Sequence, residues 1–191
     1  MSTRGFASLI MLFAIALIPA VTWAGGTPVG PGTIEFAPSL AFSRSAYTPA
    51  GGGASTSMTH LDLTGAVGRC MSDRLEIMGA LLVQHRDQAG AGRNGIGASA
   101  GVGVNLAAYG NMIPFLSGSV GVLKYTNPGS SDRTVLAPIL RAGIRTLIME
   151  GRSVNVSIGY QHEVNPKSVV NKRADAFDIG VGMSIFRAPT D

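Results

Sequence analysis

The sequence predicts an all-β fold: an eight-stranded antiparallel up-and-down transmembrane β-barrel, preceded by a cleaved signal peptide. A short apolar segment near the start is typical of an export signal. After residue 33, successive segments alternate between apolar and small or polar side chains, which is the period of a β-strand. The connections between these segments alternate between long and short, as they do in transmembrane barrels.

The first 24 residues have the three parts of a secretory signal peptide. Arg4 supplies the positive charge, the segment 6–18 is apolar apart from Ser8, and Thr22 and Ala24 supply the small side chains before a cleavage site. The apolar segment is shorter than the roughly 20 residues that a membrane-spanning helix needs. We therefore expect a signal peptide at 1–24, a short lead at 25–32, the barrel at 33–186 and a C-terminal tail at 187–191.

The composition argues against several other classes of protein. Cys70 is the single cysteine, so a scaffold of internal disulfides is excluded. The net charge is +4, but the basic residues are scattered, and we expect no nucleic-acid partner. His60, His85 and His162 lie on separate segments without the spacing of metal ligands, so we expect neither a metal nor a cofactor.

The first three expected strands each have one apolar face. The apolar residues are Ile34, Phe36, Leu40 and Phe42 in the strand at 33–45, Leu61, Leu63 and Val67 at 57–69, and Leu75, Ile77, Leu81 and Val83 at 74–84. The opposite faces carry polar residues such as His60 and Gln84. Since successive side chains point to opposite sides of a sheet, we expect one face toward lipid and one toward the lumen.

The next three strands, expected at 96–106, 112–126 and 136–148, differ in clarity. The fourth alternates Ile, Ala and Val with Gly and Ser. The fifth is apolar on both faces, so its register stays open. The sixth sets the apolar residues Leu136, Leu140, Ile144 and Ile148 against two arginines.

The strands expected at 153–161 and 176–185 alternate most regularly. The small residues Gly180, Gly182 and Ser184 suit the crowded lumen of an eight-stranded barrel, which side chains fill. A secreted soluble β-domain would need a charged outer face, and the polar faces here carry few charges. We therefore favour the membrane barrel over a soluble domain.

The connections support this choice. Long loops are expected at 46–56, 86–93, 127–134 and 164–172, and tight turns at 71–73, 109–111 and 150–152. An interfacial girdle of aromatic residues would be sparse, because aromatics make up only 6% of the chain. Its candidates are Tyr47, Tyr109, Tyr125 and Phe186.

Over 33–186 this pattern resembles the small outer-membrane barrels of the OmpA/OmpX type. The most specific segment runs from Phe177 to Phe186 and looks like the C-terminal signal read by the outer-membrane assembly machinery. Here five residues follow the final aromatic, and the apolar alternation ends on Ile185. The resemblance implies a place in the cell outer membrane, with outer-membrane lipid, periplasmic chaperones and the assembly machinery as partners.

Two groups of charged residues are candidate sites. The first would face the lumen as an ion-pair network or, alternatively, line a narrow ion path; it comprises Glu35, Asp62, Glu76, Arg141, Arg145 and Asp178. The second would lie in the outer loops and contact lipid phosphates or only water; it comprises Arg86, Arg93, Arg133, Lys167, Lys172 and Arg173.

His162 raises an enzymatic alternative. Some small outer-membrane barrels are lipid A deacylases, with a His and a Ser two residues later near a strand end, plus an acid. His162 resembles the first part of that pattern, but the nucleophile position holds Val164. The sequence therefore favours a non-enzymatic barrel with a filled lumen and a structural or interaction role; the alternatives are a deacylase-like enzyme and a small ion channel.

Overall fold

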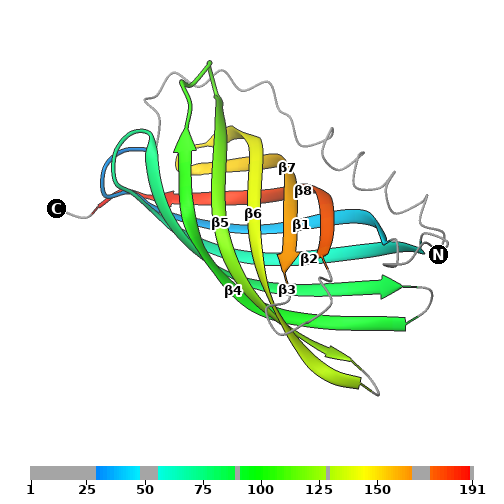
Figure 1. Ribbon diagram of the computed structural model, residues 1–191. Helices are drawn as coiled ribbons and strands as arrows, with labels where there is room; N and C mark the ends of the chain where they lie inside the picture. The colour runs from blue at the N-terminus through cyan, green and yellow to red at the C-terminus, as the bar shows by residue number, and fades with distance from the viewer. Residues whose placement is uncertain (1–28, 48–55, 89–90, 128–129, 165–172, 190–191) are drawn as a thin grey trace.

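The chain folds into a closed barrel of eight antiparallel strands in sequential order (Figure 1). The computed structural model describes residues 29–47, 56–88, 91–127, 130–164 and 173–189. The strands are β1 (Ile34–Tyr47), β2 (Thr56–Cys70), β3 (Leu75–Gln88), β4 (Ala91–Asn105), β5 (Met112–Asn127), β6 (Ser130–Met149), β7 (Arg152–Val164) and β8 (Arg173–Arg187). This confirms the predicted fold class. The signal peptide predicted at 1–24 lies outside the described residues and stays a prediction.

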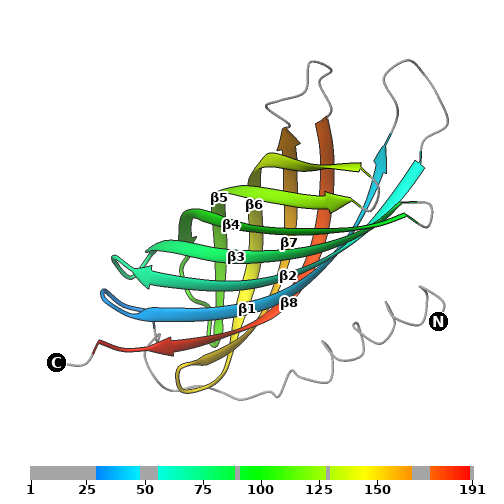
Figure 2. The same cartoon turned by 90° about the horizontal axis from the view of Figure 1, so that it is seen from below.

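The two ends of the barrel differ, as Figure 2 shows. One end, which we call the turn end, holds the tight turns after β2, β4 and β6 together with the start of β1 and the end of β8. Two of these turns need glycine, because Gly110 and Gly151 have φ values of 60° and 65°, in the left-handed region. The third is held by the Ser72 hydroxyl, which accepts a hydrogen bond from the Leu75 amide at 3.0 Å. The opposite end is called the loop end.

The strands alternate as the sequence predicts. In β7, for example, Val154, Val156 and Ile158 face outward while Ser153 and Ser157 face the lumen. The register that the sequence left open, that of β5, is decided by pairing with both neighbours. Its lumen-facing residues are Ile113, Phe115, Ser117, Ser119, Gly121, Leu123 and Tyr125.

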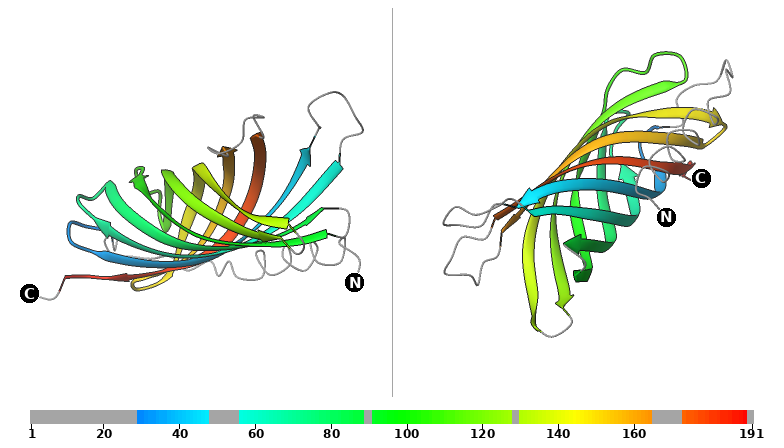
Figure 3. Two further views of the ribbon diagram at one scale, coloured as in Figure 1. Left: turned by 60° about the horizontal axis from the view of Figure 1, so that its bottom comes forward. Right: turned by 90° about the vertical axis from the view of Figure 1, so that its right-hand side faces the viewer.

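Two of the predictions of long loops are wrong. The segments 86–93 and 127–134 were expected to be long loops, but β3 and β4 pair as far as Gln88 and Ala91, and β5 and β6 as far as Asn127 and Ser130. Their outward-facing residues near the loop end are polar, which hides the strand pattern from a search for apolar alternation. The strands therefore continue past the apolar part of the barrel wall, tilted around its axis (Figure 3).

The outer wall carries a belt of exposed apolar side chains to which every strand contributes. Its members include Phe36, Leu63, Leu81, Ile96, Val120, Leu140, Ile158 and Ile179. Toward the loop end the outward-facing residues become polar, as at His85, Asn94 and Thr134. Tyr125 and Phe186 do not join an aromatic girdle: both face the lumen and are buried. No helix in the described part of the chain is long and apolar enough to cross a membrane.

Two prolines interrupt the hydrogen-bonded ladders of the wall. Pairing between β1 and β8, the seam that closes the barrel, passes from Phe36↔Ile185 to Ser39↔Gly182 and omits Pro38. Pairing between β6 and β7 likewise omits Pro138. Proline has no N–H to donate, so one ladder bond is lost at each place.

Candidate functional site

The lumen holds most of the buried charges, and the first group of them lies near the turn end. Arg145 on β6 donates from Nη2 to Glu35 Oε2 at 2.7 Å and to Glu76 Oε2 at 3.1 Å. Its Nη1 donates to Asn105 Oδ1. These four side chains come from β6, β1, β3 and β4, so they cross the lumen from one wall to the other. We call them the Arg145 layer.

Apolar side chains pack beside the Arg145 layer. The guanidinium carbon of Arg145 lies 4.7 Å from the ring centre of Phe115 and 6.0 Å from that of Phe186, distances at which a cation is attracted to an aromatic face. Phe186 also belongs to a buried cluster with Val29, Cys70, Ile113 and Leu147. The final aromatic residue of β8 thus packs inside the turn end of the barrel.

A cavity of about 120 Å³ lies in the middle of the lumen. Hydroxyl groups from five strands line it, including Ser39, Thr64 and Ser117, and Arg141 and Arg145 border it. A cavity of this size lined by polar groups has room for water. It is the space left by the small inward-facing residues that the sequence places in the lumen.

On the loop side of the cavity an apolar cluster from β3, β5 and β6 packs inside the lumen. It consists of Leu82, Leu123, Tyr125, Val135, Ala137 and Ile139. Leu123 and Val135 have no exposed surface. Inward-facing apolar residues on β5 and β6 explain why these strands look apolar on both faces in the sequence.

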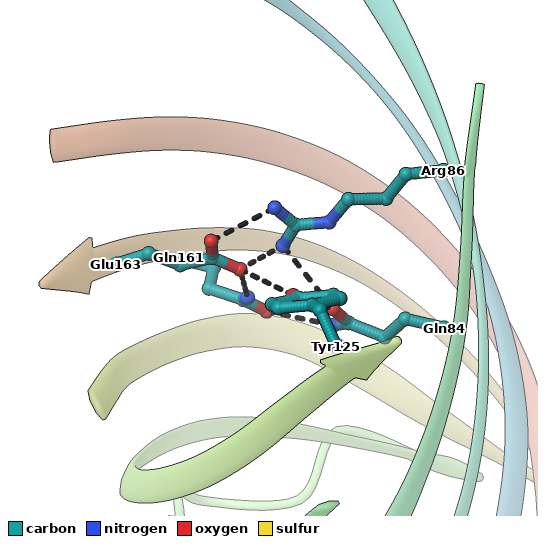
Figure 4. A network of polar contacts seen from close by, with 5 residues as sticks. All are labelled: Gln84, Arg86, Tyr125, Gln161 and Glu163. Carbon is teal, nitrogen blue, oxygen red and sulfur yellow. Dashed lines mark hydrogen bonds and ion pairs between the residues drawn. The ribbon is translucent and has the colours of Figure 1, made fainter. Parts of the chain in front are cut away.

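Beyond the apolar cluster lies a second polar layer, the Arg86 layer, shown in Figure 4. Arg86 on β3 donates from both terminal nitrogens to the Glu163 carboxylate on β7, with Nη1 to Oε2 at 2.8 Å. Arg86 also lies over the ring of Tyr125, 4.3 Å from its centre. Gln84 and Gln161 complete the layer, joined by a hydrogen bond from Gln84 Nε2 to Gln161 Oε1 at 3.2 Å.

The Glu163 carboxylate is the centre of that layer. The Tyr125 hydroxyl lies 2.7 Å from Glu163 Oε1, and Gln161 Nε2 donates to the same oxygen at 2.7 Å. Arg86 and Glu163 are 7% and 2% exposed. A buried charge costs several kcal/mol unless it is paired and hydrogen-bonded, and both conditions hold here.

All six residues of the expected lumen network face the lumen. Glu35, Glu76 and Arg145 meet in one layer. Arg141 and Asp178 form a separate pair, with Nη2 and Oδ1 3.4 Å apart. Asp62 is buried on β2, and its Oδ1 has no hydrogen-bond partner among the described residues.

Four of the six cations expected in outer loops lie on strands; contact with a lipid phosphate is wrong for the buried Arg86 and stays a prediction for the others. Arg86 is not a loop residue but is buried in the lumen with Glu163. Arg93 on β4 and Arg133 on β6 each lie two residues before a residue that faces the lumen, Gly95 and Val135 respectively. Both arginines are therefore on the lumen side of their strands. Arg173 begins β8. Lys167 and Lys172 lie outside the described residues.

The sequence reasoning missed the partners in the Arg86 layer. Glu163 is absent from the lumen residues that the sequence predicts, although it follows Gln161 at the spacing of two that places both on the lumen face. Extending the alternation of β7 by one more residue would have found it. The pairing with Arg86 could not be found in this way, because 77 residues separate the two.

A third polar group lies on the outer wall near the loop end. His162 Nδ1 and the Tyr160 hydroxyl both lie 2.6 Å from Asp175 Oδ1 on β8. The ring of Tyr160 lies 5.0 Å from that of Phe177. A histidine and an acid are therefore in contact, and the adjacent outward-facing position on β7 is Val164, which has no nucleophilic group.

Comparison with known proteins concerns the fold. No protein-family model matches the sequence, and no curated protein matches it. Among solved structures, the N-terminal β-barrel domain of Pseudomonas aeruginosa OprF is similar at 15% identity and a TM-score of 0.54, covering 83% of this chain and 99% of that one. Neisserial surface protein A is similar at 15% identity and a TM-score of 0.55, covering 79% and 96%.

The outer membrane protein OprG of Pseudomonas aeruginosa is similar at 12% identity and a TM-score of 0.54, with 84% of this chain and 98% of that one covered. The identities are low, so these similarities concern the backbone architecture alone. The chain has the fold of a small eight-stranded outer-membrane β-barrel.

Proposed function

We propose that this chain is an integral protein of the bacterial outer membrane with a sealed lumen and a structural or interaction role. Its turn end would face the periplasm and its loop end the outside, since outer-membrane barrels have short periplasmic turns. The observation that carries the proposal is the combination of an apolar outer belt with a lumen filled by the Arg145 layer, the apolar cluster and the Arg86 layer.

The belt supports the membrane location. Leu81, Ile158 and Phe177 are 70%, 64% and 70% exposed on the wall. Large contiguous apolar surfaces are rare on soluble monomers. Closure of the sheet also pairs the strand edges, which a spanning structure requires because lipid offers no hydrogen-bond partners to the backbone.

The contents of the lumen support the absence of a wide pore. An ion moving along the axis would meet the Arg145 layer, the apolar cluster around Leu123, and the Arg86 layer in turn. The two polar layers are held by ion pairs across the lumen, and within the apolar cluster the only polar side-chain group, the Tyr125 hydroxyl, is hydrogen-bonded to the Arg86 layer.

The mature chain, folded in detergent and run unboiled and boiled in SDS, tests the membrane proposal. We expect a mobility shift and no solubility without detergent. Folded protein added to planar bilayers should give no steady conductance. A soluble, unshifted protein would point to a secreted β-domain, and steady conductance from shifted protein would point to a channel.

A lipid-modifying enzyme is the second candidate, because His162 and Asp175 are in contact on the outer wall. Catalysis of this kind would need a nucleophile within hydrogen-bond reach of the histidine, and Val164 does not supply one. We therefore expect no acyl-chain release when the folded protein is incubated with outer-membrane lipid. Release that is lost in His162→Ala and kept in His85→Ala would replace the scaffold proposal with the enzymatic one.

A further inference from the structure

Three arginines lie close together on the outer wall at the turn end. Arg69 on β2 and Arg187 on β8 both pair with Ile34, which lies between them on β1. Arg152 on β7 pairs with Ile185, two residues before Arg187. Neighbouring strands are about 4.8 Å apart, so the Cα atoms of Arg69 and Arg187 are separated by roughly 10 Å, within the combined reach of two guanidinium groups.

The three side chains are exposed and face outward. Among the described residues none of them forms an ion pair, although Asp73 and Glu150 lie in the turns at the same end of the barrel. Three unpaired cations side by side repel one another, so a shared anion would lower the energy of the group.

The outward-facing strand arginines are confined to one arc of the rim, while the other charges at this end, such as Arg74, lie in the turns. Outward-facing residues at the same level on β3 to β6 are uncharged, for example Leu75, Val104 and Met112. The arginines occupy β7, β8 and β2, on either side of the seam between β1 and β8. This seam is the one that Pro38 interrupts.

Apolar side chains adjoin the arginines on the side of the barrel belt. Phe36, Val67 and Ile185 are each between 43% and 50% exposed, and they form one cross-strand row, since Phe36 pairs with both of the others. A partner that fits this surface needs an anionic head at the arginines and an apolar chain along that row. An acidic soluble peptide would contact only the arginines and leave the apolar row uncovered.

We infer that Arg69, Arg152 and Arg187 bind the phosphate of an anionic glycerophospholipid in the periplasmic leaflet, with its acyl chains against Phe36, Val67 and Ile185. This inference rests on the proposed function, which sets the turn end in the periplasm. Guanidinium groups bind phosphate oxygens in forked, charge-assisted pairs. One headgroup shared by β8 and β2 would bridge β1 and hold the closing seam together.

The test is native mass spectrometry of the folded mature protein titrated with phosphatidylglycerol or phosphatidylcholine of identical acyl chains. Each basic residue near a membrane surface adds to the attraction for anionic lipid, so we expect roughly tenfold tighter binding of phosphatidylglycerol. The double variant Arg69→Gln/Arg187→Gln should bind both lipids equally. The control Arg44→Gln/Lys124→Gln removes the same charge from the loop end and should keep the preference.

Several results would overturn the inference. An unchanged preference in Arg69→Gln/Arg187→Gln would do so, as would an equal loss in the control, which would indicate attraction by net charge alone. Displacement of the lipid by inorganic phosphate would assign the site to free phosphate. The SDS mobility shift separates this from the proposed function: a shifted barrel without lipid preference refutes only the inference, whereas an unshifted wild-type protein refutes the membrane proposal itself.

Discussion

Arg86 on β3 and Glu163 on β7 form a two-pronged ion pair across the lumen, although 77 residues separate them in the chain. Neither strand neighbours the other in the barrel wall. The pair therefore joins opposite walls, and Tyr125 from β5 packs against both partners. The same construction recurs at the turn end with Arg145, so the lumen is crossed by charged contacts at two levels.

Removal of one partner of the pair should be costly. Arg86→Met leaves the Glu163 carboxylate buried without its cation, and we expect a loss of about 3 kcal/mol in the free energy of unfolding. The double variant Arg86→Met/Glu163→Met should recover part of that loss, because no unpaired charge remains. Urea titration of vesicle-folded protein, followed by the fraction with folded gel mobility, measures both. If the loss in the double variant equalled the sum of the losses in the two single variants, the pairing would be contradicted.

The single cysteine reports on packing at the turn end. Cys70 is 1% exposed and belongs to the same cluster as Phe186, so a thiol reagent should not react with it in the folded barrel. Phe186→Ala opens a cavity beside it, and we expect rapid labelling together with a loss of about 3 kcal/mol. Phe177→Ala, on the outer face of the same strand, is the control and should leave Cys70 protected. Equal labelling of both variants would show that Phe186 does not cover the thiol.

Pro38 should weaken the closing seam by one hydrogen bond. Pro38→Ala restores an N–H that can donate from β1 to β8, and this hydrogen bond adds about 1 kcal/mol to the free energy of unfolding. The substitution also raises the conformational entropy of the unfolded chain, which lowers the free energy of unfolding by about 0.5 kcal/mol. Pro31→Ala is the control, because Pro31 lies before β1 and outside every strand ladder, so its replacement frees the unfolded chain without adding a ladder bond. We expect Pro38→Ala to be the more stable variant by about 1 kcal/mol in urea titrations. A reversed order would mean that the missing N–H does not explain the gap in the seam.

A charge placed on the belt distinguishes lipid from water around the barrel. Leu81→Arg lies at the middle of β3 on the outer wall and should cost about 2–4 kcal/mol in vesicles, whereas Thr126→Arg near the loop end should cost about 0–1 kcal/mol. A soluble domain would tolerate both changes within about 0.5 kcal/mol, since both positions are exposed. Unfolding in vesicles compares the two. Similar small costs would contradict a lipid-facing belt.

Much of the wall could be predicted from the sequence, because strand alternation is a local property. The outward face of β7 follows from Val154, Val156 and Ile158 alone, whichever strands lie beside it. The expected loops at 86–93 and 127–134 failed for the same reason: polar outward-facing residues such as Asp87 and Thr134 carry no apolar alternation, and only pairing with a neighbour keeps them in a strand.

The sequence by itself determined the number of strands, the two faces of seven of them and six of the acidic and basic residues that enter the lumen. Only the tertiary structure decided the register of β5, the burial of Arg86 and the partner of each charge. The reason is physical. Whether a side chain faces lipid or the lumen depends on whether its position along its own strand is odd or even. Which residues meet across the lumen depends on the stagger of all eight strands at closure, and no local segment encodes that.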